Sequence, residues 1–240
     1  MPSTASPLCA SVSAIVALNS EGIRSLQAKD FAGSITTLSK AISDLKRFLA
    51  ESEEENWDCH HACHDLLFGF QMDRQEEFES MDVLESPFVF ETPIKVTRRR
   101  VNKSEATPET ISDMLKMLSF ALVFNLAIAF HLGAIHHRSG SIESPTTKKR
   151  LMKALAFYKL SLNMIQNQQL ALGVMESIAV ANNQAHVYLL LGQGKQAEEC
   201  YQQVLSDIMY VADSGNQREI PLFERFFANV VKPSPTAKAA

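Results

Sequence analysis

This chain of 240 residues has little of what nucleic-acid-binding and disulfide-rich secreted proteins need. Its formal net charge is −4, whereas a general nucleic-acid binder usually carries a basic face, so we expect no nucleic-acid partner. Its four cysteines are too few and too scattered for a disulfide framework, which favours a reducing compartment. One tryptophan against 14 phenylalanines and 9 methionines suits packed helices rather than a stacking site for carbohydrate.

The motifs of common enzyme classes are missing as well. No serine or cysteine stands in a glycine-framed turn, and there is no phosphate-binding loop. Gly192-Gln193-Gly194 lacks the rest of a dinucleotide fingerprint. We therefore expect neither an enzyme nor a cofactor. The chain also starts without the charged and apolar regions of a secretory signal, so we expect a cytoplasmic protein, with the nucleus as the alternative because of the Arg98-Arg99-Arg100 run.

Apolar residues recur at spacings of three and four over most of the chain, which predicts an all-α fold. We expect three irregular helix–turn–helix hairpins at about 8–52, 108–167 and 170–212, with Asp30 as the N-cap of the second helix. A short helix at 219–231 would cap the last hairpin. Together with an insertion at 53–107 these would form one domain over 8–231, between disordered ends at 1–7 and 232–240.

The insertion changes character along its length. Residues 51–85 hold 12 acidic side chains and one basic one, and we expect a loop there with a short helix at His61–Phe70. Phe88–Val96 is rich in β-branched and aromatic residues and reads as an isolated extended segment without a sheet to join. Its apolar side chains need burial, so it would lie either in a groove between the helices, as a ligand in cis, or across a convex edge.

Small residues repeat with one spacing in two of the hairpins. Gly22, Ser34 and Ala41 are separated by twelve and seven positions, and so are Ala185, Ala197 and Val204. A middle copy at Ala127, Ala154 and Ser161 keeps only the second interval. With the aromatic residues Phe31, Phe130, Tyr158, Tyr188 and Tyr201 at matching places, the chain resembles tetratricopeptide-repeat proteins. The run ALVFNLAIAFHL after FVFETPIKV is also similar to repeat proteins of unicellular algae.

The resemblance implies a protein-binding scaffold or adaptor with a protein or peptide partner. The first helix of each hairpin would line a concave groove, and the positions concerned are Asn19, Ile23, Phe124, Ile128, His131, Asn182, His186 and Leu190. Family members that grip a peptide carboxylate use lysine or arginine on this face, and none stands at these positions. The predicted groove is therefore apolar and would accept an apolar segment.

Two other interpretations compete with the scaffold. Cys59, His60, Cys63 and His64 have zinc-binding side chains at helical spacing, but a second cysteine or histidine pair is missing nearby, so a regulatory zinc site is the alternative and no metal is the prediction. Leu118–Ile135 is almost long enough to span a membrane. Asn125 and His131 are costly in lipid but can be satisfied between helices, so we expect a buried helix and no membrane partner.

Overall fold

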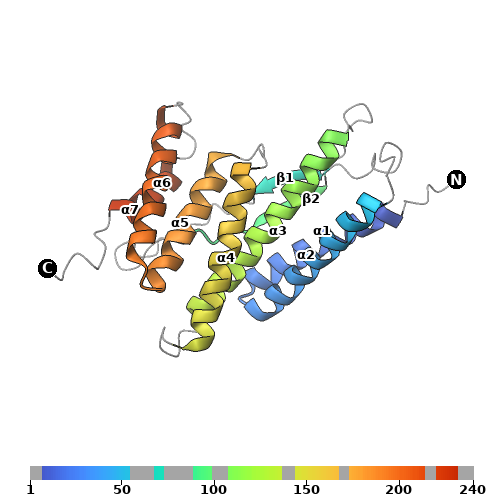
Figure 1. Cartoon of the computed structure of the whole chain (residues 1–240), viewed down its shortest axis with the longest axis horizontal. Helices are drawn as coiled ribbons and strands as arrows, with labels where there is room; N and C mark the ends of the chain where they lie inside the picture. Colours follow the sequence, from blue (N-terminus) through green and yellow to red (C-terminus); the bar gives the residue numbers. More distant parts are fainter. Residues whose placement is uncertain are drawn as a thin grey trace. The chain divides into compact units, whose positions relative to one another are not determined.

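The computed structural model describes residues 7–54, 68–72, 89–98, 108–136, 144–167, 173–213 and 220–231. Within these ranges the chain forms seven helices and two short strands (Figure 1), which confirms the predicted all-α fold. The helices are α1 (Pro7–Gln27), α2 (Phe31–Glu54), α3 (Pro108–His136), α4 (Pro145–Asn167), α5 (Val174–Leu190), α6 (Gly194–Asp213) and α7 (Ile220–Val231); the strands are β1 (Phe68–Met72) and β2 (Ile94–Arg98).

The chain divides into two compact units. The first comprises Met1–Arg74 and Thr92–Gly133, and the second comprises Gln75–Glu91 and Ala134–Ala240. The chain thus passes between the units three times: after Arg74, inside the extended segment after Glu91, and in the last turn of α3 after Gly133. The prediction of one domain over 8–231 stays a prediction. Of the expected disordered ends, Pro7 already belongs to α1, and the remainder lies outside the described residues.

In the first unit α1 and α2 form an antiparallel hairpin. The predicted cap is confirmed, because the Asp30 carboxylate accepts a hydrogen bond from the Gly33 backbone N–H at 2.9 Å. Gly22 lets the two helices approach closely: a Cβ atom there would stand 2.6 Å from Cγ of Leu38. The small residue that defines the repeat spacing is therefore required by packing.

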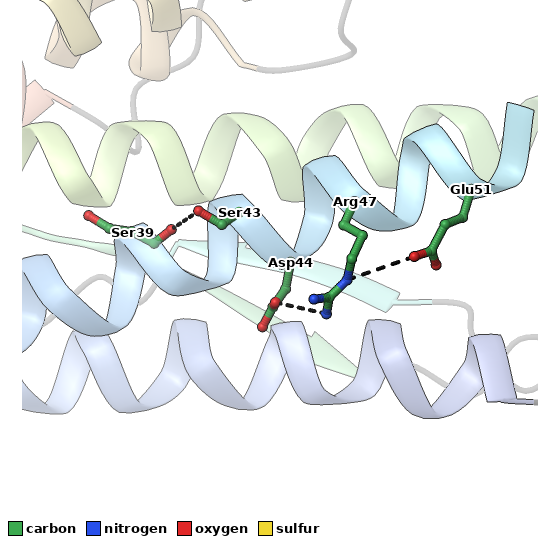
Figure 2. Close-up of polar contacts among 5 residues, drawn as sticks. All are labelled: Ser39, Ser43, Asp44, Arg47 and Glu51. Atoms are coloured by element: carbon green, nitrogen blue, oxygen red, sulfur yellow. Dashed lines mark hydrogen bonds and ion pairs between the residues drawn. The ribbon is translucent and has the colours of Figure 1, made fainter.

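The solvent-facing side of α2 carries short-range polar contacts. Figure 2 shows Arg47 between two acidic side chains of the same helix, with its guanidinium 3.0 Å from Asp44 and 3.9 Å from Glu51. One turn earlier, the Ser43 hydroxyl donates to the Ser39 carbonyl at 3.0 Å. Exposed ion pairs at this spacing contribute only a few tenths of a kcal/mol. The buried face of α2, with Leu38, therefore carries more of the hairpin's stability.

The two turns that close hairpins α1–α2 and α5–α6 have the same geometry. In the first, Lys29 N–H donates to Leu26 C=O at 3.0 Å and Asp30 N–H donates to Ser25 C=O at 2.9 Å. In the second, Gly192 donates to the Leu189 carbonyl and Gln193 donates to the Tyr188 carbonyl at 3.0 and 2.9 Å. This pattern requires a positive φ, which is +60° at Lys29 and +73° at Gly192.

The extended segment is not isolated, so that part of the sequence prediction is wrong. β2 pairs antiparallel with β1, with Phe68 opposite Arg98 and Met72 opposite Ile94. The helix expected at His61–Phe70 is also wrong at its end, since residues 68–70 lie in β1. The reason is that each residue of β2 pairs with a residue 22 to 30 positions away in the chain, which local periodicity does not reveal.

α3 is the most apolar helix of the described chain. All its residues from Phe120 to Ala134 are buried, and Gly133 lies against the side chain of Phe31 at the start of α2. Its stretch Ser112–His136 is long and apolar enough to cross a membrane, but 89% of its most apolar window is buried within the protein. A core helix passes the same test of length and composition, so this stretch is weak evidence for a membrane span.

In the second unit α5 is the central helix. It packs against α4 and α6, and α7 packs against α6 and α5. Ala185, Tyr188 and Ala197 form a buried cluster, with Tyr201 and Cys200 of α6 packed on it. The expected end-capping helix is present as α7, within one residue of the predicted start.

The residue with positive φ is Lys29 in one turn and Gly192 in the other. Substitutions at these two positions should change the free energy of unfolding in opposite directions. Lys29→Gly should raise the free energy of unfolding by about 0.5–1 kcal/mol, because glycine adopts positive φ without strain. Gly192→Ala should lower it by about 1 kcal/mol, since the added methyl has room and only the backbone is strained. Urea denaturation measures both.

Lys40→Gly is the matched control for the first substitution. Lys40 is exposed within the regular part of α2, where glycine should cost about 1 kcal/mol. If Lys29→Gly destabilises the protein as Lys40→Gly does, the turn stores no relievable strain and the prediction is contradicted.

Candidate functional site

In the first unit a buried amide of α3 holds one residue of the extended segment by its backbone. Asn125 accepts a hydrogen bond from Ile94 N–H at 2.7 Å through Oδ1, and donates to Ile94 C=O at 2.8 Å through Nδ2. Nδ2 also donates to Oδ1 of Asn19 at 3.0 Å, and the Asn19 amide approaches the Ile94 carbonyl at 3.4 Å. We call this arrangement the Asn125 clamp. All three residues are fully buried.

In the second unit an amide of α5 makes the same pair of bonds. Asn183 accepts from Phe90 N–H at 2.8 Å and donates to Phe90 C=O at 2.8 Å. Its Nδ2 also donates to the Tyr158 hydroxyl at 3.2 Å. We call this arrangement the Asn183 clamp. Burial raises the pKa of Tyr158 well above its ordinary value, with the Asn183 hydrogen bond acting in the opposite direction, so its hydroxyl stays neutral.

The two clamps occupy the same position in the repeat spacing. Asn125 lies two residues before the small residue Ala127, and Asn183 lies two residues before Ala185. The residues that they hold, Phe90 and Ile94, are four positions apart in the chain. Helices of similar sequence pattern therefore present the same side chain to the same kind of backbone group.

A primary amide suits this task because it carries donor and acceptor side by side, as a peptide group does. It satisfies the N–H and C=O of one extended residue together, as a neighbouring strand would. The contacts do not involve the side chain of the held residue. Phe90 and Ile94 are buried, whereas Glu91 and Lys95, which follow them, are exposed.

The Asn183 clamp is extended by α7. The Phe90 ring stacks on the ring of Phe226, with 6.0 Å between centroids and an interplanar angle of 26°. Asn229, three residues further along α7, donates to Oδ1 of Asn182 at 2.6 Å. Asn182 in turn donates to Oδ1 of Asn183 at 3.3 Å. The chain of amides thus runs from α7 to the backbone of Phe90.

The residues predicted to line the groove are mostly buried. Asn19 lies in the Asn125 clamp and Asn182 supports the Asn183 clamp. The others contribute to helix burial: Ile23, Phe124, Ile128, His131 and His186 are buried, and Leu190 is half-buried. Sequence reasoning missed Asn183, Asn229 and Phe226 and treated Tyr158 as a packing residue. It expected Asn125 to be satisfied between helices but did not identify its partner. A usable signal was present, because an asparagine within an apolar helix requires a buried partner.

The zinc alternative rests on Cys59, His60, Cys63 and His64, which lie outside the described residues. Within the part of the chain that the structure describes, no group of three histidine, cysteine or acidic side chains could hold a metal ion. The absence of a metal and of a cofactor therefore stays a prediction.

Cys200 is the cysteine whose surroundings the structure describes, and it is a free thiol. Burial, followed by the nearby charge of Glu199, raises its pKa from 9.0 to about 11. An activated nucleophile needs the opposite shift, toward the thiolate. Burial likewise raises the pKa of Tyr201.

The first prediction from this site concerns the Asn125 clamp. Asn125→Leu should lower the free energy of unfolding by about 2–5 kcal/mol, because the buried N–H and C=O of Ile94 lose their hydrogen bonds to Asn125. Asn163→Leu, at an exposed position of α4, should change it by less than about 0.5 kcal/mol. Urea denaturation measures the difference, and hydrogen exchange at the Ile94 amide should accelerate in the first variant alone. Unchanged protection at Ile94 would contradict the clamp.

The second prediction concerns Cys200 in a chain carrying Cys9→Ser, Cys59→Ser and Cys63→Ser. The rate of alkylation by iodoacetamide should rise with pH to a midpoint of about 11, whereas the urea-unfolded chain should show a midpoint of about 8.5. Because the folded state holds this proton more tightly, the thiol's contribution to stability is complete below the unfolded pKa and is lost as pH rises toward the folded pKa. Equal midpoints would show that the thiol is not desolvated.

Comparison of this chain with protein-family models, with curated proteins and with solved structures yields no match. The geometry of the two clamps and the segment that they hold are therefore the basis for the function.

Proposed function

We propose that this chain is a non-enzymatic scaffold of the tetratricopeptide-like type that binds an extended segment of a partner protein by its backbone. Residues 89–96 would act as the ligand in cis, that is, from the same chain. The observation that carries the proposal is the bidentate pairing of Asn125 with Ile94 and of Asn183 with Phe90.

Backbone pairing supports a binding role because it is transferable. An extended peptide from another protein offers the same N–H and C=O groups at each residue, so it can form the same pair of hydrogen bonds at either clamp. The side chains of the helices do not need to change.

The repeat pattern supports the same interpretation. The clamps stand at one repeat position, and the turns of hairpins α1–α2 and α5–α6 share their hydrogen bonds. Repeat scaffolds present equivalent positions of successive units to an elongated ligand. We propose a cytoplasmic location, with the nucleus as the alternative.

The test uses the full chain with residues 88–97 replaced at equal length by glycine and serine, with proline at positions 90 and 94. Proline lacks the N–H that each clamp accepts, and the replaced segment lacks the apolar side chains that favour its burial, so both clamps lose their resident segment. Two labelled peptides, residues 86–93 and 91–98, each address one unit. We expect saturable binding by fluorescence anisotropy. Asn183→Ala should weaken the binding of the 86–93 peptide by about tenfold or more, and Asn125→Ala should weaken the binding of the 91–98 peptide to a similar extent.

N-methylated peptides provide the matched control. A methyl group on the Phe90 amide removes the N–H that donates to Asn183. It should weaken binding of the 86–93 peptide as Asn183→Ala does. A methyl group on the amide of Thr92, which belongs to neither of the two peptide groups that Asn183 contacts, should have little effect. A chain with native far-UV circular dichroism that binds neither peptide would overturn the scaffold proposal.

A further inference from the structure

We infer that the Asn183 clamp is a subsite for an aromatic side chain, and that α7 is part of the ligand site rather than only a cap on the helical array. The inference rests on the proposed function and names its ligand class. The ligand is an extended peptide segment of a partner protein with an aromatic residue at the clamped position. Phe90 is the resident example.

The surroundings of the Phe90 ring favour an aromatic side chain. Phe90 is 5% exposed, and its ring stacks on the ring of Phe226 of α7, which is fully buried. The separation of 6.0 Å and the angle of 26° fall within the range of favourable aromatic pairs. A smaller side chain at this position would lose the ring contact and leave a cavity, and a charged one would be buried.

α7 also orients the amide of Asn183, which hydrogen-bonds to the backbone of Phe90. Asn229 and Phe226 are three residues apart, so they lie on one face of α7. Asn229 bonds to Asn182, and Asn182 bonds to Asn183. All three asparagines are at least 96% buried, in a surrounding where a lost hydrogen bond is costly. α7 therefore supplies the ring on which Phe90 stacks and also orients the Asn183 clamp.

The residues on either side of Phe90 are less buried than Phe90 itself. Val89 is half-buried and Glu91 is exposed, so the flanking side chains meet the protein less than Phe90 does. The backbone bonds are the same for any residue. Selectivity at this subsite therefore comes from the one side chain that enters it.

The test uses the segment-replaced full chain and three versions of the 86–93 peptide, with phenylalanine, cyclohexylalanine or alanine at position 90. Cyclohexylalanine has a similar size but no π system, so it isolates the ring contact. We expect phenylalanine to bind about 2- to 10-fold more tightly than cyclohexylalanine, and about a hundredfold more tightly than alanine.

Substitutions in α7 assign the effect to that helix. Phe226→Leu should abolish the preference for phenylalanine over cyclohexylalanine, and Phe227→Leu, at the next and exposed position, should leave it unchanged. Asn229→Ala should weaken the binding of all three peptides by a similar factor, because it removes a hydrogen bond that supports the Asn183 clamp and leaves the Phe226 ring in place. This variant also serves if Phe226→Leu does not fold.

The outcomes separate the two proposals. If no peptide binds to the folded chain, the scaffold proposal fails and the inference fails with it. If the 86–93 peptides bind with one affinity whatever stands at position 90, the scaffold proposal stands and the aromatic subsite is overturned. If Phe226→Leu and Asn229→Ala leave every affinity unchanged, α7 is not part of the ligand site.

Discussion

The structure depends on how an extended segment can be buried among helices. A helix satisfies its own backbone groups, whereas an extended segment has to find every partner elsewhere. β1 pairs with part of this segment. At Phe90 and Ile94 a single asparagine amide replaces a neighbouring strand and satisfies N–H and C=O together. Without those two amides, these two buried residues would lose the four hydrogen bonds that Asn125 and Asn183 make to their backbone groups.

This requirement explains the unusual composition of the helices concerned. α3 is buried from Phe120 to Ala134 and α5 from Ile178 to Tyr188, yet each carries an asparagine in the middle of its run. An asparagine in such a helix is unfavourable unless it is fully hydrogen-bonded. Asn19, Tyr158, Asn182 and Asn229 provide the remaining bonds. The polar network and the extended segment are therefore mutually dependent.

Much of the helical framework could be predicted because its signals are local. Apolar periodicity located the helices to within a few residues, and Asp30 identified the start of α2 through its own carboxylate. The clamps could be predicted only in part. Asn19 and Asn182 were expected on the inner face, but Asn183 and Phe226 were missed, since their partners lie 93 and 136 positions away along the chain. Pairing of β2 with β1 was missed for the same reason.

By itself the sequence determined which stretches are helical, where the tight turns fall and which positions must be small, because these follow from periodicity, capping and steric contact over a few residues. Only the tertiary structure decided which residue of the extended segment meets which asparagine, and that α7 contributes a ring and an amide to one of these sites. Hydrogen bonds between distant residues depend on the folded path of the whole unit. The amino-acid pattern alone indicates that a buried asparagine needs a partner, but not which one it has.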